Sequence, residues 1–305
     1  MSTQRDPRET FAHTAVDLLD EDRSVALVYA EISGQYFGQA ERRHPDRVVN
    51  VGIREQLLVS VGAGLALTGL RPVVHTFTSF LVERPFEQVK LGFGHQDVGG
   101  VLVSVGGSYD LASAGRTHQG PGDVALLDTL PGFTIWTPGH ADEVEQAVRS
   151  AVAGSGRHYV RVVAQQNSRA YDVQPGRFTV VRRGRAGAVV AVGPMLDPVL
   201  EATADRDVTV LYAGAVRPFD AATLRAVLDA GVTTDVVLVE PYLAGTSSRL
   251  VADALRDRPH RLLALGVGRE ELRHYGTASE HAAAHGLDAA GLRRSLDAFL
   301  GRRAA

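Results

Sequence analysis

Short apolar runs alternate with longer helix-like segments along the chain, and this alternation limits the fold more than any other feature. The run VLVSV at residues 101–105 is almost entirely apolar, as in strands that are covered on both faces. Repetition of strand, helix and strand predicts a mostly parallel sheet flanked by helices. In the first half we predict strands at 24–29, 72–77, 101–105, 133–136 and 159–163, and helices at 53–68, 80–91, 123–130 and 141–153. The helix at 80–91 requires Pro85 to lie in its first turn.

A second set of the same kind follows a polar segment, residues 165–185, which contains Pro175-Gly176 and is interpreted as a linker. Strands are predicted at 188–192, 208–212, 236–239 and 261–265, and helices at 220–229, 247–257 and 288–300. We therefore predict an α/β protein with two domains, residues 1–172 and 173–305, each a mostly parallel sheet flanked by helices. A length of 305 residues suits two domains.

The composition argues against several classes of function. The net charge of −3 gives no general attraction to nucleic acid or to an anionic membrane. The absence of cysteine excludes disulfides, thiolate metal sites and cysteine nucleophiles, and it fits a cytosolic protein. The polar N-terminal segment lacks the apolar core of a signal peptide, and no uncharged apolar run reaches the roughly 18 residues of a membrane span. We therefore expect a cytoplasmic protein that binds neither nucleic acid nor membrane.

One carboxylate stands out because of its position. Glu55 lies in the segment Val51-Gly-Ile-Arg-Glu-Gln56, directly before an apolar run at residues 57–70 that is predicted to be a buried helix. Burying a charge is costly, so a buried carboxylate usually has a partner or a chemical task. The alternative is a solvated glutamate that is favoured at a helix start by the helix dipole.

Further motifs follow in a set order, and together with the Glu55 segment they resemble the C-terminal section of split transketolases, which are thiamine diphosphate (ThDP) enzymes made of two polypeptides. The likeness covers most of residues 10–165 and, more weakly, 185–300. Each motif alone is weakly specific, whereas their order and spacing together are typical of the family. The matching segments are Val51–Gln56, Gly64–Ala66, Pro72–Phe77, Phe80, Arg84–Gln88, Thr117–Gly120 and Asp123–Gly132.

The resemblance implies a pyrimidine-binding domain followed by a transketolase C-terminal domain, and it assigns roles to several residues. The carboxylate of Glu55 would hydrogen-bond to N1′ of the ThDP aminopyrimidine and activate the cofactor. Phe80 would stack on the pyrimidine and Phe77 would line the same wall, since a flat heteroaromatic ring favours an aromatic face. Ile32 would hold the cofactor in its bent form. For both phenylalanines and Ile32, the alternative is ordinary core packing.

A histidine completes the expected site. His118 matches a family histidine that faces substrate near C2 of the thiazolium ring, and imidazole can move a proton near neutral pH. The alternative is a loop histidine that caps the helix near Gly122. Arg84 and Gln88 are interpreted as structural or interface groups. Four other histidines, at positions 75, 95, 140 and 158, lack metal-ligand spacing, so no metal site is predicted in this chain.

Departures from the family pattern matter as much as the matches. ThDP enzymes hold the diphosphate through Mg²⁺ with a Gly-Asp-Gly segment and a later asparagine, and this chain has no Gly-Asp-Gly. The resemblance therefore implies a partner subunit that carries the diphosphate and Mg²⁺ domain, in a heterotetramer of two chains of each kind.

The residues that the family uses to read its sugar substrate also differ. Ala114 replaces an acidic residue, Gly106-Gly107 stands where a histidine is expected, and Gln165 aligns with an arginine that grips phosphate. Glutamine does not replace that charge, although Arg116 can supply a cation from another direction. These changes favour a specialised pathway with a non-phosphorylated or 2-oxo acid substrate.

The predicted function is therefore that of the C-terminal subunit of a two-component, ThDP-dependent transketolase-like enzyme. It would transfer a two-carbon ketol or acyl unit from a ketose or 2-oxo acid to an aldehyde. Three alternatives stay open: the β subunit of a 2-oxo acid dehydrogenase, a 1-deoxyxylulose-phosphate-synthase-like enzyme, and a non-catalytic scaffold subunit.

Overall fold

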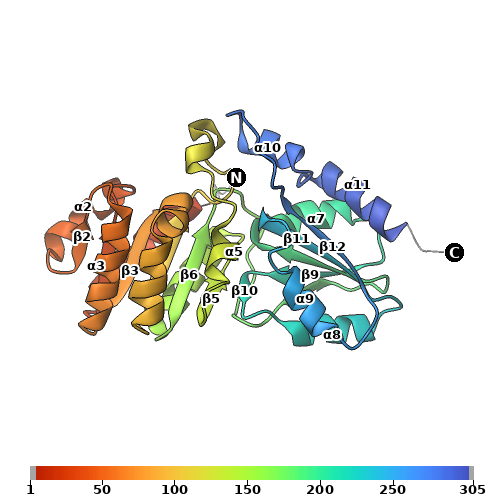
Figure 1. Cartoon of the computed structure of the whole chain (residues 1–305), viewed down its shortest axis with the longest axis horizontal. Helices are drawn as coiled ribbons and strands as arrows, with labels where there is room; N and C mark the ends of the chain where they lie inside the picture. Colours follow the sequence, from red (N-terminus) through yellow and green to blue (C-terminus); the bar gives the residue numbers. More distant parts are fainter. Residues whose placement is uncertain (1–4, 302–305) are drawn as a thin grey trace.

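Two mostly parallel β-sheets, each flanked by helices, form the structure, a computed structural model that describes residues 5–301 (Figure 1). The first sheet has the strand order β10-β5-β6-β4-β3-β1-β2, and the second has the order β12-β11-β8-β9-β7. The predicted α/β fold class is confirmed. The strands of the first sheet are β1 (Val25–Tyr29), β2 (Val48–Asn50), β3 (Arg71–Phe77), β4 (Gly100–Val105), β5 (Phe133–Trp136), β6 (Arg157–Val162) and β10 (Ala215–Arg217). Those of the second are β7 (Thr179–Arg182), β8 (Ala188–Val192), β9 (Thr209–Ala213), β11 (Asp235–Leu243) and β12 (Arg261–Val267).

Helices and short helical turns connect these strands. In the first half they are α1 (Pro7–Glu21), α2 (Gly34–Arg43), α3 (Glu55–Leu67), η1 (Ser79–Glu83), α4 (Phe86–Gln88), η2 (Val89–His95), η3 (Ala112–Ala114), η4 (Arg116–His118), α5 (Asp123–Leu127) and α6 (Ala141–Ala153). In the second half they are η5 (Gly193–Met195), α7 (Leu196–Ala202), α8 (Ala221–Asp229), α9 (Ser248–Ala254), α10 (Ala278–Ala284) and α11 (Ala289–Leu300). None of these helices combines the length and apolar character needed to cross a bilayer.

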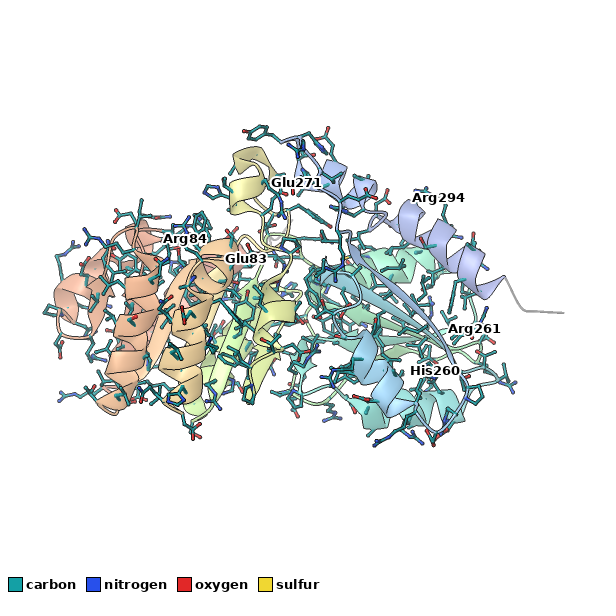
Figure 2. All side chains as sticks on the ribbon, in the orientation of Figure 1. Glu83, Arg84, His260, Arg261, Glu271 and Arg294 are labelled. Carbon is teal, nitrogen blue, oxygen red and sulfur yellow. The ribbon has the colours of Figure 1, made fainter. Side chains whose placement is uncertain are left out.

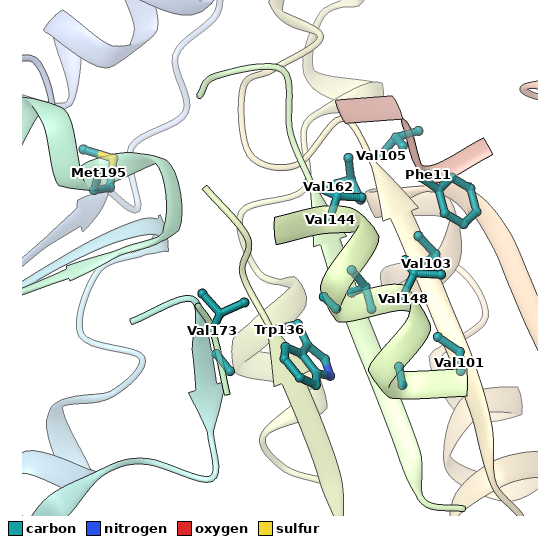
Figure 3. Packing of buried hydrophobic residues seen from close by; sticks show 14 of the residues in the cluster. Phe11, Val101, Val103, Val105, Trp136, Val144, Val148, Val162, Val173 and Met195 are labelled. Atoms are coloured by element: carbon teal, nitrogen blue, oxygen red, sulfur yellow. The ribbon is translucent and has the colours of Figure 1, made fainter. Parts of the chain in front are cut away.

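The central strands of the first sheet are buried on both faces. In β4, Val101, Val103 and Val105 belong to a core cluster that also contains Phe11 of α1 and residues of α6 (Figure 3). Leu102, between them, belongs to a second cluster on the opposite face. Because side chains alternate across a strand, a run that is apolar throughout needs a cover of helices on each side.

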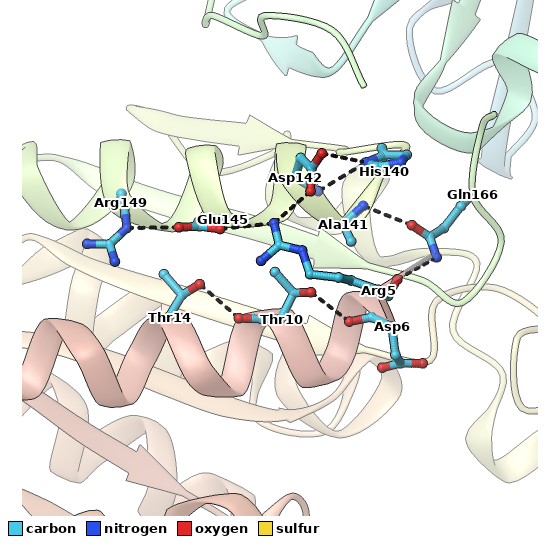
Figure 4. A network of polar contacts seen from close by, with 10 residues as sticks. All are labelled: Arg5, Asp6, Thr10, Thr14, His140, Ala141, Asp142, Glu145, Arg149 and Gln166. Atoms are coloured by element: carbon cyan, nitrogen blue, oxygen red, sulfur yellow. Dashed lines mark hydrogen bonds and ion pairs between the residues drawn. The ribbon is translucent and has the colours of Figure 1, made fainter. Parts of the chain in front are cut away.

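The N-terminal helix is tied to α6 by polar contacts at its start (Figure 4). The guanidinium of Arg5 lies 2.6 Å from Asp142 and 3.1 Å from Glu145. Gln166 donates to the carbonyl of Arg5 and accepts from the amide of Ala141. Each exposed ion pair contributes little by itself, so the set mainly fixes the position of α1 relative to the carboxyl end of the first sheet.

The prediction of one continuous helix at 80–91 is wrong. The segment consists of the π-turn η1, the short α4 and the π-turn η2, with Pro85 between η1 and α4. Proline has no amide hydrogen and therefore cannot continue an α-helical ladder from within it. Arg84, the residue before the break, donates its amide to the carbonyl of Ser79, five residues earlier.

The predicted linker at 165–185 is also only partly right, because it contains the edge strand β7, which pairs antiparallel with β9. The second half of the chain moreover returns to the first sheet, where β10 pairs antiparallel with β5. Arg217 at the end of β10 reinforces this contact, since its guanidinium donates two hydrogen bonds to the carboxylate of Asp128. The two predicted domains are thus joined by a shared sheet as well as by the chain.

Candidate active site

Glu55 is the first residue of α3 and lies in the protein interior, with only 2 % of its surface exposed. The chain reaches it from β2 through Gly52, whose φ of 67° favours glycine. A carboxylate at this point is stabilised by the unpaired amides of the first helical turn. The structure therefore places Glu55 in the buried setting that its sequence context predicts.

Close packing of α3 on the sheet holds this position. A Cβ atom added to Gly62 would lie 2.5 Å from Cγ2 of Val74 in β3, so only glycine allows the observed approach. Leu58 and Val59 of the same helix are fully buried. The helix that carries Glu55 is consequently fixed against the central strands.

Three rings meet near the carboxyl end of β3. Phe77 ends this strand, Phe80 follows in η1, and His118 comes from η4, about forty residues later. The ring centroids of Phe80 and His118 are 5.0 Å apart, and those of Phe77 and His118 are 5.6 Å apart, in edge-to-face geometry. Such contacts fix ring orientation as well as position. The structure thus brings together three residues that sequence analysis assigned to one site.

Arg84 joins this cluster to Glu55. Its Nη1 lies 2.7 Å from Oε2 of Glu55, and its Cζ lies 4.0 Å from the centroid of the Phe80 ring. Figure 2 shows Arg84 near the upper edge of the first unit, which consists of the first sheet and its helices; the second sheet and its helices form the second unit. The sequence indicated only a structural or interface role for Arg84, and these two contacts were not predicted from it. The spacing of four residues from Phe80 was the available signal, because it places two helical side chains on one face.

Ile32 lies in a loop that is anchored to the same region. It is partly buried and packs against the core cluster that Phe77 also contacts. The neighbouring Ser33 accepts a hydrogen bond from Nε of Arg8 and contacts Nε2 of His75, while the Arg8 guanidinium lies 5.7 Å from the Phe77 ring. Burial lowers the pKa of His75 to about 3, so the imidazole is neutral, which suits a structural hydrogen bond rather than proton transfer.

Arg116 and Gln165 lie elsewhere. Arg116 forms an exposed ion pair at 3.2 Å with Glu271, which belongs to the second half of the chain, and it lines a cavity of about 270 Å³ between the two units. Gln165 donates to the carbonyl of Pro194 and lines a neighbouring cavity of about 670 Å³. Ser108 lines both cavities. Arg116 begins the turn η4 that carries His118, but among residues 5–301 no hydrogen bond or ion pair joins Arg116 or Gln165 to Glu55, Phe80 or His118.

A buried polar network, unnoticed in the sequence, supports the loops around these residues. Arg161 of β6 donates to Asp123 at 2.7 Å and to Ser108 at 2.6 Å, and Tyr159 also donates to Asp123. A Cβ at Gly107 would lie 2.5 Å from Cζ of Arg161. Glycine at the position where the family resemblance leads one to expect histidine therefore makes room for this guanidinium.

The side chains gathered here are of the kinds that bind a flat, hydrogen-bonding group. A buried carboxylate, an aromatic face and an imidazole surround one region, and the planar guanidinium of Arg84 shows that a flat group with N–H donors fits between Glu55 and Phe80. Among residues 5–301, no group of three or more metal-ligating side chains is placed to hold an ion. The carboxylate and the aromatic face are of the kinds that could hold the aminopyrimidine of ThDP.

Comparison with known proteins supports this interpretation. Residues 4–168 match the family model described as the transketolase pyrimidine-binding domain. A protein from Rhodococcoides fascians, described as an uncharacterized 33.6 kDa protein in the fasciation locus, is 49 % identical over 95 % of this chain and 94 % of its own. A 1-deoxy-D-xylulose-5-phosphate synthase from Oleidesulfovibrio alaskensis is 32 % identical over 96 % of this chain.

The length of the match differs between these relatives. This chain covers 48 % of the synthase and so spans about half of that protein. A solved structure described as a split gene transketolase, inactive beta4 tetramer, superposes with a TM-score of 0.83 at 24 % identity, over 97 % of this chain and 98 % of that chain. The fold of this chain thus matches nearly the whole length of the chain in that structure.

Proposed function

The chain belongs to the transketolase family defined by this pyrimidine-binding domain, and we propose that it is the C-terminal subunit of a two-component, ThDP-dependent transferase. The observation that carries the proposal is the convergence of Glu55, Phe80 and His118 on one region, although they are far apart in the sequence. Burial of a carboxylate beside an aromatic face is expected where a cofactor ring must be both bound and activated.

Each side chain then has a distinct task. When bound, ThDP supplies a carbon nucleophile that takes up a two-carbon unit and passes it on. Glu55 would hold a proton against N1′ of the aminopyrimidine, and Phe80 would provide the stacking face. His118 would move a proton at a substrate oxygen. Phe77 and Ile32 would exclude water and limit the space that the cofactor occupies.

We assign the diphosphate and Mg²⁺ to a partner subunit. The chain has no Gly-Asp-Gly segment, and the solved split gene transketolase is described as an inactive beta4 tetramer. Two apolar residues beside Glu55 are exposed: Ile53 by 74 % and Leu57 by 44 %. Apolar side chains at the edge of an incomplete site fit burial by a second polypeptide. The proposed assembly is a cytoplasmic heterotetramer of two such chains and two N-terminal transketolase-like chains.

The reaction that we propose transfers a two-carbon unit to an aldehyde. A ketose donor would leave as a shortened aldehyde, and a 2-oxo acid donor would release carbon dioxide. Sequence relatedness to 1-deoxy-D-xylulose-5-phosphate synthases makes a 2-oxo acid donor the second candidate. Gln165 supplies no charge where the family resemblance places a phosphate-binding arginine, which favours a non-phosphorylated substrate.

Reconstitution tests the proposal. The chain would be co-expressed with a protein that contains Gly-Asp-Gly and a downstream asparagine, then supplied with ThDP, Mg²⁺ and a panel of ketose and 2-oxo acid donors with aldehydes. Mass spectrometry should detect a product longer than the aldehyde by two carbons, only when both chains are present. A complex that assembles but does not bind ThDP would contradict the proposal and support a scaffold role. Product formation that requires a lipoyl carrier would instead identify a 2-oxo acid dehydrogenase β subunit.

A further inference from the structure

Arg84 contacts the same two groups that the proposed cofactor would need, the carboxylate of Glu55 and the ring of Phe80. Its Nη1 lies 2.7 Å from the carboxylate of Glu55, and its Cζ lies 4.0 Å from the centre of the Phe80 ring. The Glu55 side chain is 3 % exposed, whereas that of Arg84 is 41 % exposed. We propose that Arg84 is an internal stand-in for the aminopyrimidine, which closes the half-site in the free subunit and leaves when the cofactor binds. This inference rests on the proposed function.

The two groups compete because they satisfy the same partners in the same way. A guanidinium is planar, presents N–H donors at its edge and stacks on an aromatic face. An aminopyrimidine in the proposed orientation is also planar and hydrogen-bonds to the carboxylate through a ring nitrogen. At 4.0 Å from the ring centre, the guanidinium leaves no room for a second layer against that face of Phe80. One group must therefore move before the other can enter.

The local backbone allows Arg84 to move without unfolding its neighbours. Arg84 lies at the junction between η1 and α4, directly before Pro85. Its amide is satisfied by the carbonyl of Ser79, so the main chain keeps its hydrogen bond when the side chain rotates. Because two-fifths of the side chain is already exposed, rotation toward solvent costs little burial.

In the free subunit, the positive charge of Arg84 also stabilises the buried carboxylate of Glu55. An unpaired buried carboxylate is costly, and Arg84 supplies the counter-charge until a partner subunit and the cofactor complete the site. An aminopyrimidine must displace the ion pair and the cation–π contact of Arg84 before it can bind, so their presence should lower the affinity of the free chain for it by about tenfold. Arg84 would thus oppose cofactor binding before assembly.

The test measures binding to the full-length chain alone, which separates it from enzyme activity. The probe is 4-amino-5-hydroxymethyl-2-methylpyrimidine, the base of ThDP without its thiazolium and diphosphate, followed by ligand-observed NMR titration. Arg84→Gln should bind the probe about tenfold more tightly than the unchanged chain. Arg54→Gln is the matched control, because it removes an exposed charge from the residue before Glu55. The double variant Glu55→Gln/Arg84→Gln should lose this gain in affinity for the probe.

Each outcome decides the proposal. Equal or weaker binding by Arg84→Gln, an equal gain in Arg54→Gln, or no binding by any variant would overturn it. If Arg84→Gln fails to fold by circular dichroism, Arg84→Met replaces it, since it keeps the packing over Phe80 without the charge. Titration of ThDP into the two-chain complex identifies the other failure: a complex that does not bind ThDP refutes the proposed function, whereas one that binds it without any Arg84 effect refutes only the stand-in.

Discussion

At the scale of single residues, Glu55 and Arg84 show how local chemistry and tertiary contact combine. The residue type and position of Glu55, at the start of an apolar helix, indicate a carboxylate with a special role. Its counter-ion Arg84 is 29 positions away and lies just before Pro85, after the turn η1, so no local pattern pairs them. The contact exists because α3 and η1 both begin at the same edge of the first sheet.

Substitution of Glu55 tests the residue scale. Glu55→Gln in the two-chain complex should lower kcat about 100-fold or more, because the amide cannot hold a proton at N1′ as a carboxylate does. Binding of ThDP, followed by tryptophan fluorescence or calorimetry, should fall much less. Glu201→Gln, an exposed glutamate of α7, is the control. Full activity of Glu55→Gln would refute its assignment as the activating carboxylate.

At the scale of elements, the fit between α3 and β3 decides where Glu55 lies. Gly62 and Gly64 are two residues apart in this helix, yet their surroundings differ. A Cβ at Gly62 would collide with Val74, whereas one at Gly64 would meet nothing within 4 Å. Helical periodicity predicts which face is buried, but only the packed sheet determines how close the helix can come.

The two glycines form a matched pair for measurement. Gly62→Ala should lower the free energy of unfolding by about 1–3 kcal/mol through overpacking. Gly64→Ala should leave it unchanged or raise it by up to about 1 kcal/mol, since alanine is the better helix former. Urea unfolding followed by circular dichroism gives both values. Equal effects of the two substitutions would show that α3 does not pack on Val74 as described.

At the scale of the whole molecule, the seam between the two units contains buried ionisable groups. Glu240 of β11 is fully buried, and burial raises the pKa of its carboxyl from 4.5 to about 7. One of its oxygens accepts from the amide of Ser247, and the other has no hydrogen-bond partner within residues 5–301. Arg217, on the strand β10 that joins the first sheet, lowers the pKa of this carboxyl and thereby opposes the effect of burial. Its titration is therefore linked to the packing of one unit on the other.

The sign of the pH dependence follows from this raised pKa. Between pH 4.5 and 7 the folded chain retains a proton on Glu240 that the unfolded chain releases, so the free energy of unfolding falls as pH rises through this window. Glu240 accounts for up to about 3 kcal/mol of this fall in the free energy of unfolding. Asp110, whose pKa burial raises to about 6, acts in the same direction.

Substitution isolates the contribution of Glu240. Urea unfolding from pH 5 to 8 should show a flatter profile for Glu240→Gln than for the unchanged chain, because the amide cannot titrate. Glu201→Gln provides a control of the same chemistry at an exposed position. Parallel profiles for the unchanged chain and Glu240→Gln would show that Glu240 titrates near its ordinary pKa.

The sequence by itself determined the α/β class and drew attention to Glu55, because side-chain periodicity and residue chemistry are local properties. The expectations for Phe80 and His118 came from the family resemblance of the motifs. Tertiary structure alone decided that β10 joins the first sheet, that the segment around Pro85 breaks into separate turns, and that Arg116 and Gln165 line cavities between the units. It also placed Arg84 on Glu55 and Phe80. The orientation of a side chain on a short turn is set by contacts, each worth about 1 kcal/mol, with segments that are distant in the sequence. Such contacts leave no pattern in the local sequence.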